Sequence, residues 1–312
     1  MTQTRFSKAT VILNPKAAGS RTLRSSAPIL EELRTCADSL DLVRTRDKGD
    51  GIVLARKAVE LGSDLVVAVG GDGTVNEVVN GMFMGVRRTE RQCVLGILPA
   101  GSSSSLAKEL GIPQGADAVK LITHGTMRAI DLILLQWLTP QCERKERLAA
   151  SMAHFGFGGA VARLVGPWIK KAGGFLAFAV AATVELVRHK SRLMSVEIDG
   201  TEIAQSRLLC AIVASSRWEG GGMCVAPQAI PDDGLLDVVV VKDLPVSSRL
   251  RCFPKVYKGT HLDLPEVTSA RGRIVSIKSG HVIPFEFDGE SAECRKCRIE
   301  VIPRALKVLV PK

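Results

Sequence analysis

The segment Gly70-Gly71-Asp72-Gly73-Thr74 combines flexible glycines with one carboxylate and one hydroxyl. It follows a continuous apolar run, Leu65–Val69, and precedes apolar residues at helical spacing from Val75 to Met82. Glycine lets a backbone approach a ligand closely, and the N–H groups at a helix start attract an anion. The sequence therefore predicts a strand, a phosphate-sized loop and a helix, with Asp72 placed to hold a metal ion or to orient a hydroxyl.

This glycine segment differs from the two most familiar phosphate-binding motifs. No lysine follows it, as the P-loop pattern requires, and Asn76 occupies the position of the third glycine in Gly-x-Gly-x-x-Gly. The alternative is a strand-to-helix turn that binds no ligand. We favour a ligand site, because a purely structural turn does not need several glycines beside an acid.

Other loops with small or hydrogen-bonding residues follow predicted strands in the first half of the chain. They are Asn14–Gly19, Thr45 with Lys48-Gly49-Asp50, and Gly101–Ser105. In an open parallel sheet, the loops at the carboxyl ends of the strands line one crevice. Together they predict a nucleotide site, although Gly101–Ser105 alone would equally suit a flexible serine loop.

The elements that position these loops change character along the chain. Up to about Asp131, strands alternate with helices, which we expect at Pro28–Leu40 and Gly51–Leu61. This alternation predicts an α/β nucleotide-binding domain with a parallel sheet over residues 1–131.

Strands dominate the second half, residues 132–302, interrupted by a predicted helix near 172–190. Asp199-Gly200 and Asp288-Gly289 are typical of hairpin turns. This half is therefore predicted to be an antiparallel β-sandwich domain.

Composition limits the partners of the chain. At 312 residues with 46% hydrophobic residues, it can form two domains with full cores. Its net charge of +10 predicts an anionic partner, either a nucleotide or an acidic membrane surface. Nucleic acid is not expected, because aromatic residues are only 4% and no dense basic tract or nucleic-acid-binding motif is present.

The longest apolar stretch, Ala172–Val187, is too short to span a membrane and contains Glu185. It fits a core helix, or a helix lying against a bilayer surface because basic residues flank it. The polar start Met1–Ala9 does not resemble a signal peptide, so we expect a cytoplasmic protein that is peripheral at the membrane surface. The eight cysteines are expected to be free thiols, since Cys294 and Cys297 form one C-x-x-C pair without a second.

The chain resembles the diacylglycerol kinase catalytic-domain superfamily, which includes soluble bacterial lipid kinases, sphingosine kinases and ceramide kinases. The resemblance extends over nearly the whole chain and rests on several motifs in the order of that family. They are Asn14-Pro15 with Gly19, Gly70–Thr74 followed by Asn76-Glu77, Leu98–Ser102, Pro231–Asp237, Asp288–Glu290 and Pro303–Leu306. It implies an α/β domain of the NAD kinase and diacylglycerol kinase type, completed by residues 303–312, and joined to a β-sandwich that binds lipid.

The resemblance also implies ATP-dependent phosphorylation of a lipid hydroxyl, with ATP and Mg²⁺ as cofactors. The implied ATP-binding residues are Asn14, Thr45, Val69, Gly70, Gly71, Asp72, Gly73, Thr74, Val75, Gly101 and Ser102. Asp72 would help to place the phosphates and Mg²⁺, and Glu290, beside Asp288, would be the general base for the lipid hydroxyl. From the residues alone, Asp288–Glu290 would be interpreted as a plain hairpin turn.

By the same resemblance, Pro231–Asp237 implies a structural Mg²⁺ bound by Asp232 or Asp233, by Asp237 and by the carbonyl near Leu235. An acidic turn without metal is the alternative.

The chain departs from the bacterial diacylglycerol kinases at Ser104-Ser105, where those enzymes carry Asn-Asp. Here it is closer to the sphingosine and ceramide kinases. The acceptor is therefore left open among diacylglycerol, a sphingoid base, ceramide or a related lipid. A catalytically weak protein that binds nucleotide and lipid, and an NAD kinase-like enzyme, are the alternatives. The expected partners are a lipid acceptor at a membrane surface and, as an alternative to a monomer, a second copy of the chain.

Overall fold

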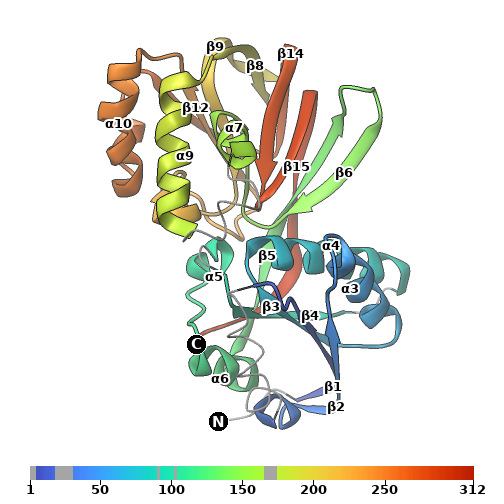
Figure 1. The fold of residues 1–312 in the computed structure, drawn as a ribbon. Coiled ribbons are helices and arrows are strands. Elements are labelled where there is room, and N and C mark those ends of the chain that lie inside the picture. The colour runs from blue at the N-terminus through green and yellow to red at the C-terminus, as the bar shows by residue number, and fades with distance from the viewer. Residues whose placement is uncertain (1–4, 18–30, 90–91, 102–103, 165–173) are drawn as a thin grey trace. The chain divides into compact units, whose positions relative to one another are not determined.

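The structure is a computed structural model that describes residues 5–17, 31–89, 92–101, 104–164 and 174–312 (Figure 1). The chain forms two compact units. The first comprises Met1–Ile130 and Arg304–Lys312, and the second comprises Asp131–Pro303.

The first unit contains a parallel sheet. Its strands are β1 (Phe6–Leu13), β2 (Ala37–Arg44), β3 (Leu65–Gly70), β4 (Val94–Pro99) and the end of β15 (Glu290–Val310). They lie in the order β2-β1-β3-β4-β15, and every pairing among them is parallel. Because β3 lies between neighbours and is buried along its whole length, its sequence is a continuous apolar run. The predicted α/β fold with a parallel sheet is confirmed.

The first unit includes the helices α3 (Asp50–Glu60), α4 (Asp72–Thr89), α5 (Ser105–Glu109) and α6 (Ala116–His124). Helices α3 and α4 pack closely where Gly81 meets Ile52. A Cβ at Gly81 would lie only 2.2 Å from the carbonyl oxygen of Ile52, so this close approach requires glycine. The helix predicted at Gly51–Leu61 is confirmed as α3. The helix predicted to reach Leu40 is wrong at its end, since β2 begins at Ala37 and only 31–34 are helical among the described residues of that range.

Antiparallel pairing builds the second unit. Its strands are β5 (Thr126–Leu138), which begins in the first unit, β6 (Arg144–Ala149), β7 (Met152–Gly156), β8 (Arg192–Ile198), β9 (Thr201–Ala214), β10 (Trp218–Glu219), β11 (Met223–Cys224), β12 (Leu236–Lys242), β13 (Val267–Gly272), β14 (Ile274–Phe287) and most of β15. The order is β13-β12-β9-β7-β14-β15, and β8 pairs with both β9 and β14. The long strands β9 and β14 therefore pair with β8 at one end and with β7 at the other. The predicted β-sandwich fold is confirmed.

Both predicted hairpin turns are present in this unit. Asp199 and Asp288 have φ of 49° and 45°, and the glycine after each has φ of 85°. Two successive residues with positive φ are the geometry of a type I′ turn, which matches the twist of the joined strands. The turn at Asp288 joins β14 to β15, and it fixes where Glu290 leaves the hairpin.

Aromatic rings fill the core of the second unit. Phe155 and Phe285 stack with ring centroids 4.9 Å apart, and Trp137 contacts Phe285 edge-on. Cys294 and Cys297 lie in the same core, and burial raises the pKa of Cys294 to about 12. All eight cysteines are free thiols, as predicted.

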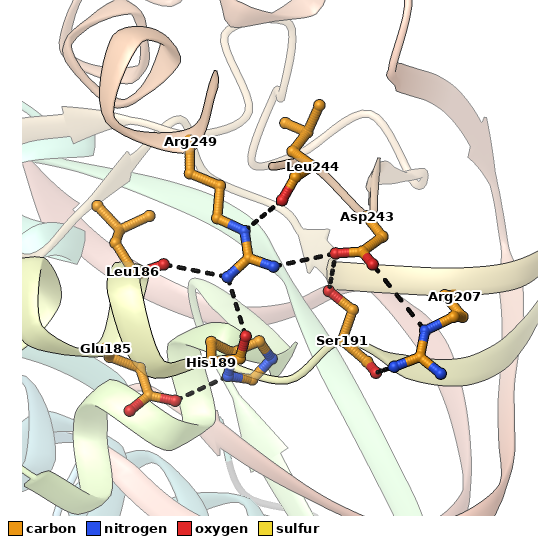
Figure 2. A network of polar contacts seen from close by, with 8 residues as sticks. All are labelled: Glu185, Leu186, His189, Ser191, Arg207, Asp243, Leu244 and Arg249. Carbon is orange, nitrogen blue, oxygen red and sulfur yellow. Dashed lines mark hydrogen bonds and ion pairs between the residues drawn. The ribbon is translucent and has the colours of Figure 1, made fainter. Parts of the chain in front are cut away.

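A buried arginine joins two helices of the second unit, α9 (Gly174–Arg188) and α10 (Val246–Lys258), which lie side by side in Figure 1. Figure 2 shows Arg249 of α10 donating to the carbonyls of Leu186 and His189, at 3.0 and 2.9 Å, and to Asp243 at 3.0 Å. Helix ends leave carbonyls without partners inside the helix. Arg249 satisfies those at the end of α9.

The predicted helix near 172–190 is present as α9, and it has two different faces among the residues whose side chains are described. Ala181, Ala182 and Leu186 are buried, whereas Val180 and Val187 are 57% and 52% exposed. In the part of the chain that the structure describes, no helix has the length and apolarity needed to cross a bilayer. Other helical elements among the described residues of this unit are α7 (Phe157–Leu164), η1 (Gly220–Gly222) and η2 (Thr260–Asp263).

Candidate active site

Helix α4 begins almost directly where β3 ends. β3 stops at Gly70 and the helix starts at Asp72, so Asp72, Gly73 and Thr74 form its first turn. The N–H groups of Thr74 and Val75 both donate to the carbonyl of Gly71, at 2.9 and 3.0 Å. The predicted phosphate loop therefore lies in the N-terminal turn of α4, and this helix starts earlier than the sequence pattern predicts.

The glycines around the start of α4 are required, or allowed, for different structural reasons. A Cβ on Gly70 would lie 2.5 Å from Oγ1 of Thr74, and one on Gly101 would lie 2.6 Å from Cα of Gly71. These positions need glycine for packing within the protein. A Cβ on Gly73 would meet no atom of the described residues within 4 Å, so Gly73 faces open space in that part of the structure. This space allows an incoming phosphate to reach the backbone.

Asn14 connects the end of β1 to this helix start. Its backbone N–H donates to the carbonyl of Val69 at 3.0 Å, and its side-chain Nδ2 donates to Oγ1 of Thr74 at 2.9 Å. The side chains of Val69 and Val75 are buried, so a ligand can contact these residues only through their backbone. The structure thus brings together the predicted ATP-binding residues Asn14, Val69, Thr74 and Val75.

Thr45 lies at the edge of a hollow in the same unit. The hollow has a volume of about 670 Å³ and is lined by Pro15, Leu42, Arg44, Thr45 and Arg46. Thr45 is itself buried, and its N–H donates to the carbonyl of Leu13 at 3.0 Å. This volume is in the range of small-molecule sites, and two arginines in the lining favour an anionic ligand.

Glu77 has a role that its sequence position did not reveal. Its carboxylate accepts hydrogen bonds from the N–H groups of Gly49 and Gly51, at 2.7 and 2.9 Å. It therefore fixes the loop between β2 and α3. Asp50 organises the same loop by accepting from the N–H groups of Arg46 and Asp47, and these bonds lower the pKa of Asp50.

The Asp72 carboxylate reaches the start of the next helix. Its Oδ1 accepts a hydrogen bond from the N–H of Ser105 at 2.8 Å, and Oδ2 lies 3.5 Å from the Ser105 hydroxyl. Gly101 contacts Gly71 in the same region, so the loops after β3 and β4 meet. Ser102, predicted to bind ATP, lies outside the described residues.

The turn Asp288-Gly289-Glu290 belongs to the second unit. The Asp288 carboxylate accepts from the N–H groups of Ala150 and Ser151, at 2.6 and 3.1 Å, and from that of Met152 at 3.3 Å. These contacts hold the turn against the connection between β6 and β7. Glu290 is partly exposed at the first position of β15. The Asp288 carboxylate is thus bonded within the protein, whereas Glu290 is partly exposed.

Buried acids next to this turn were missed by sequence reasoning. Glu286 on β14 stands directly opposite His154 on β7, and Oε2 of Glu219 lies 3.2 Å from Nε2 of His154. Burial, followed by the nearby charge of Glu219, raises the pKa of Glu286 well above its ordinary value. The available sequence signal was an acid between buried aromatics in Phe285-Glu286-Phe287, but only the strand pairing reveals its neighbours.

The acidic turn predicted to bind a structural Mg²⁺ is paired with an arginine. Strand pairing sets Arg271 of β13 opposite Asp237 of β12, with Nε 3.2 Å from Oδ2, and the same guanidinium pairs with Asp233. Leu235 contributes its N–H to Asp233 at 3.1 Å, and Asp232 is half-buried in the same turn. A divalent ion bound by Asp233 and Asp237 would have to displace Arg271. The residues do not fit a metal in this arrangement, and no His, Cys, Asp and Glu cluster suited to a metal occurs among the described residues.

Comparison with known proteins identifies both parts of the chain. Residues 8–135 match the diacylglycerol kinase catalytic domain, and residues 151–310 match the YegS C-terminal NAD kinase beta sandwich-like domain. The chain is 29% identical over 304 residues to the "Probable lipid kinase YegS-like" of Stenotrophomonas maltophilia, covering 96% of this chain and 95% of that protein. It is 27% identical over 307 residues to the "Diacylglycerol kinase" of Mycobacterium tuberculosis, covering 98% and 96%.

A solved structure shares the fold. The crystal structure of a diacylglycerol kinase from Bacillus anthracis str. Sterne matches with a TM-score of 0.73 at 21% identity, covering 98% of each chain. The catalytic-domain match covers the helix start at Asp72, and the C-terminal match covers the turn that carries Glu290. The chain therefore belongs to the family of lipid kinases that join a diacylglycerol kinase catalytic domain to a YegS-type C-terminal domain.

Proposed function

We propose that this protein is an ATP-dependent kinase that transfers the γ-phosphate of ATP to the hydroxyl of a lipid. The observation that supports it most is the start of α4, where Gly73 faces open space beside Asp72 and Thr74. A helix N-terminus with a close backbone approach suits the phosphates of ATP, which enters as its Mg²⁺ complex. The names of the relatives support a lipid as the acceptor.

In the proposed reaction, the first unit binds and orients the nucleotide. The N–H groups at the start of α4 bind phosphate oxygens, and the negative charge of Asp72 favours the Mg²⁺ that neutralises them. The hollow beside Thr45, with Arg44 and Arg46 in its lining, accommodates another part of ATP. Phosphoryl transfer depends mainly on such positioning and charge neutralisation.

Glu290 is the proposed general base in the second unit. It accepts the proton of the lipid hydroxyl as the new bond to phosphorus forms. Asp288 holds the turn by its bonds to Ala150 and Ser151, so the position of Glu290 is fixed by the backbone.

The proposed acceptor is reached at a membrane surface, on a protein of the cytoplasm. The exposed valines of α9 and the net charge of +10 support peripheral binding to an anionic bilayer. Diacylglycerol, a sphingoid base, ceramide and related lipids are all candidates for the acceptor.

A catalytically weak protein that binds nucleotide and lipid is the second candidate function. It is favoured by Ser105, which here supplies an N–H to Asp72 and has no carboxylate of its own. Radiolabelled ATP with a panel of lipids in mixed micelles separates the two. We expect one lipid class to be phosphorylated by the wild type and not by Glu290→Gln. ATP binding without any labelled lipid would support the second candidate and contradict the kinase.

A further inference from the structure

A group of buried ionisable side chains lies directly behind the turn that carries Glu290. It consists of His154 on β7, Glu219 on β10 and Glu286 on β14. Only 7% of the His154 side chain and 16% of the Glu219 side chain are exposed, and Glu286 is 7% exposed as a residue. Buried acids are costly unless they are paired, hydrogen-bonded or protonated, so this group requires a physical explanation.

Strand pairing and a tightly packed helix hold these side chains together. His154 and Glu286 are direct neighbours across β7 and β14. The first turn of α7 covers them, since a Cβ on Gly158 would lie 1.9 Å from Nδ1 of His154 and one on Gly159 would lie 2.5 Å from Cα of Phe285. The cluster is therefore packed against the first turn of α7 at His154 and at the backbone beside Glu286.

Glu286 is the cross-strand neighbour of His154, and Glu219 lies 3.2 Å from the same imidazole, so the two buried carboxyl groups lie close together. Two carboxylates at this separation repel in a buried site, and they are accommodated when one proton is shared between them. Burial and the charge of Glu219 both raise the pKa of Glu286, which agrees with a neutral Glu286 at neutral pH. Nε2 of His154 lies 3.2 Å from Oε2 of Glu219, and neither ring nitrogen has a hydrogen-bond partner among the described residues.

Glu286 connects this pair to the turn. Its Oε2 accepts a hydrogen bond from the N–H of Gly289 at 3.0 Å. Gly289 lies between Asp288 and Glu290, so the turn is held at Gly289 by Glu286 and at Asp288 by the N–H groups of Ala150 and Ser151. If the Glu286 carboxyl moved, Gly289 would lose this hydrogen bond and could shift. Glu290 would shift with it, because it is the next residue in the chain.

We propose that Glu219 and Glu286 share one proton, and that this proton-bridged pair is a positioning device that fixes Glu290 for catalysis. The proposal rests on the proposed function, in which Glu290 is the general base. Loss of the shared proton leaves two carboxylates that repel each other, and Asp288 adds a third negative charge nearby. Glu286 then moves away from Gly289, and catalysis falls at alkaline pH.

Several charged or ionisable groups face the pair. His154 faces it from β7, Asp288 faces Glu286 from the turn, and Cys210 on β9 lies close enough to Glu219 for that charge to raise the pKa of its thiol. Burial raises the pKa of Cys210 to about 12, so this thiol stays neutral over the working range. The pair is therefore the group in this cluster that controls the alkaline side of the profile.

The test compares kcat against pH for the wild type and Glu286→Gln, with the best lipid acceptor at saturating ATP. A glutamine keeps an oxygen for the N–H of Gly289 and offers an N–H₂ to Glu219, but it has no proton to lose. We expect kcat of the wild type to fall about tenfold per pH unit beyond an alkaline midpoint, and that of Glu286→Gln to remain level there. Glu293→Gln, which removes a surface carboxylate paired with Arg163, is the matched control and keeps the wild-type profile.

Glu219→Gln is the second variant, and it removes the partner charge while Glu286 remains. Its alkaline midpoint is expected to shift from that of the wild type by at least one pH unit. Identical alkaline profiles for the wild type and both glutamine variants would overturn the proposal. A structural role alone would lower kcat equally at every pH, and that result would also overturn it.

An infrared measurement separates this proposal from the proposed function. At neutral pH, the C=O stretch of a protonated carboxylic acid is expected in the wild type and is expected to be lost in Glu286→Gln. If no lipid is phosphorylated and this band is present, the kinase proposal fails while the shared proton stands. If the band is absent from the wild type, the shared proton is disproved whatever the activity.

Discussion

Oδ1 of Asp72 accepts a hydrogen bond from the backbone N–H of Ser105 at 2.8 Å, which joins the first turn of α4 to the first turn of α5. One carboxylate therefore stands at the starts of two helices, where it balances their positive ends. The bond uses the backbone of Ser105 and does not depend on its side chain. This link to Asp72 therefore does not require a carboxylate at residue 105.

The first prediction concerns Asp72. Asp72→Asn keeps an oxygen for the Ser105 N–H and removes the negative charge, so we expect a folded protein with kcat/KM lowered about 10²-fold or more. Asp72→Ala also removes the bond and should lower turnover at least as much. Ser105→Ala, which changes only the hydroxyl 3.5 Å away, should remain close to the wild type. Near-normal rates in a folded Asp72→Asn protein would contradict the role of this charge.

The second prediction concerns Glu290. Glu290→Gln should lower kcat by about 10²-fold or more while the Kd for ATP stays within about twofold, because a general base acts on the chemical step. Single-turnover assays and isothermal titration with ATP measure the two effects. Glu300→Gln, in an exposed pair with Arg298, is the control. Equal losses in both quantities would assign Glu290 to structure.

The third prediction concerns the acidic turn and Arg271. Because the guanidinium pairs with Asp233 and Asp237, the melting temperature of the wild type without nucleotide should not change on adding EDTA or Mg²⁺ at matched ionic strength. Arg271→Met leaves Asp237 buried without its partner and should lower the free energy of unfolding by about 1–3 kcal/mol. Mg²⁺ should then recover part of this loss, since it can replace the missing positive charge.

Arg298→Met is the matched control for this prediction, because it breaks an exposed pair with Glu300. It should change stability by less than about 1 kcal/mol and should not respond to Mg²⁺. A wild type that loses stability in EDTA would show that a metal ion, and not Arg271, balances this turn.

The fourth prediction uses the raised pKa of Glu286. The folded protein keeps a proton on this group that the unfolded chain releases above its ordinary pKa of 4.5. The free energy of unfolding therefore falls as pH rises from that value towards the raised pKa of the folded state, by at most about 1.4 kcal/mol per pH unit. Glu286→Gln lacks this loss, so its stability relative to the wild type should increase with pH. Urea unfolding from about pH 5 to pH 8 measures it, and parallel curves would contradict it.

Sequence patterns predicted the elements that depend on local order. The apolar run before Gly70 and the helical spacing after Thr74 correctly give β3 and most of α4. The pattern did not predict the first turn of α4, because glycine has low helix propensity. In the structure this turn follows directly after β3 ends. The start of β2 at Ala37 was also not predicted. This strand lies at the edge of the sheet, where polar residues such as Asp38 and Asp41 are tolerated, so its sequence lacks the apolar run of a central strand.

Pairs distant in sequence could not be predicted at all. The contact between Arg271 and Asp237 depends on the register of β12 against β13, and that between Glu286 and His154 depends on β14 against β7. A shift of one residue in either register would turn these side chains to opposite faces. Single-sequence periodicity identifies strands, but it does not determine which strands pair or in what register.

The central claim is that the start of α4 binds the phosphates of ATP, and Gly73→Ala tests it most directly. Among the described residues the added Cβ meets no atom within 4 Å, so the melting temperature should be unchanged or slightly higher. Gly280→Ala is the control, because its Cβ likewise meets no described atom within 4 Å and it lies in the second unit. We predict that the Kd for ATP, measured by isothermal titration, rises at least tenfold in Gly73→Ala and stays unchanged in Gly280→Ala. An unchanged Kd in a folded Gly73→Ala protein would contradict the claim.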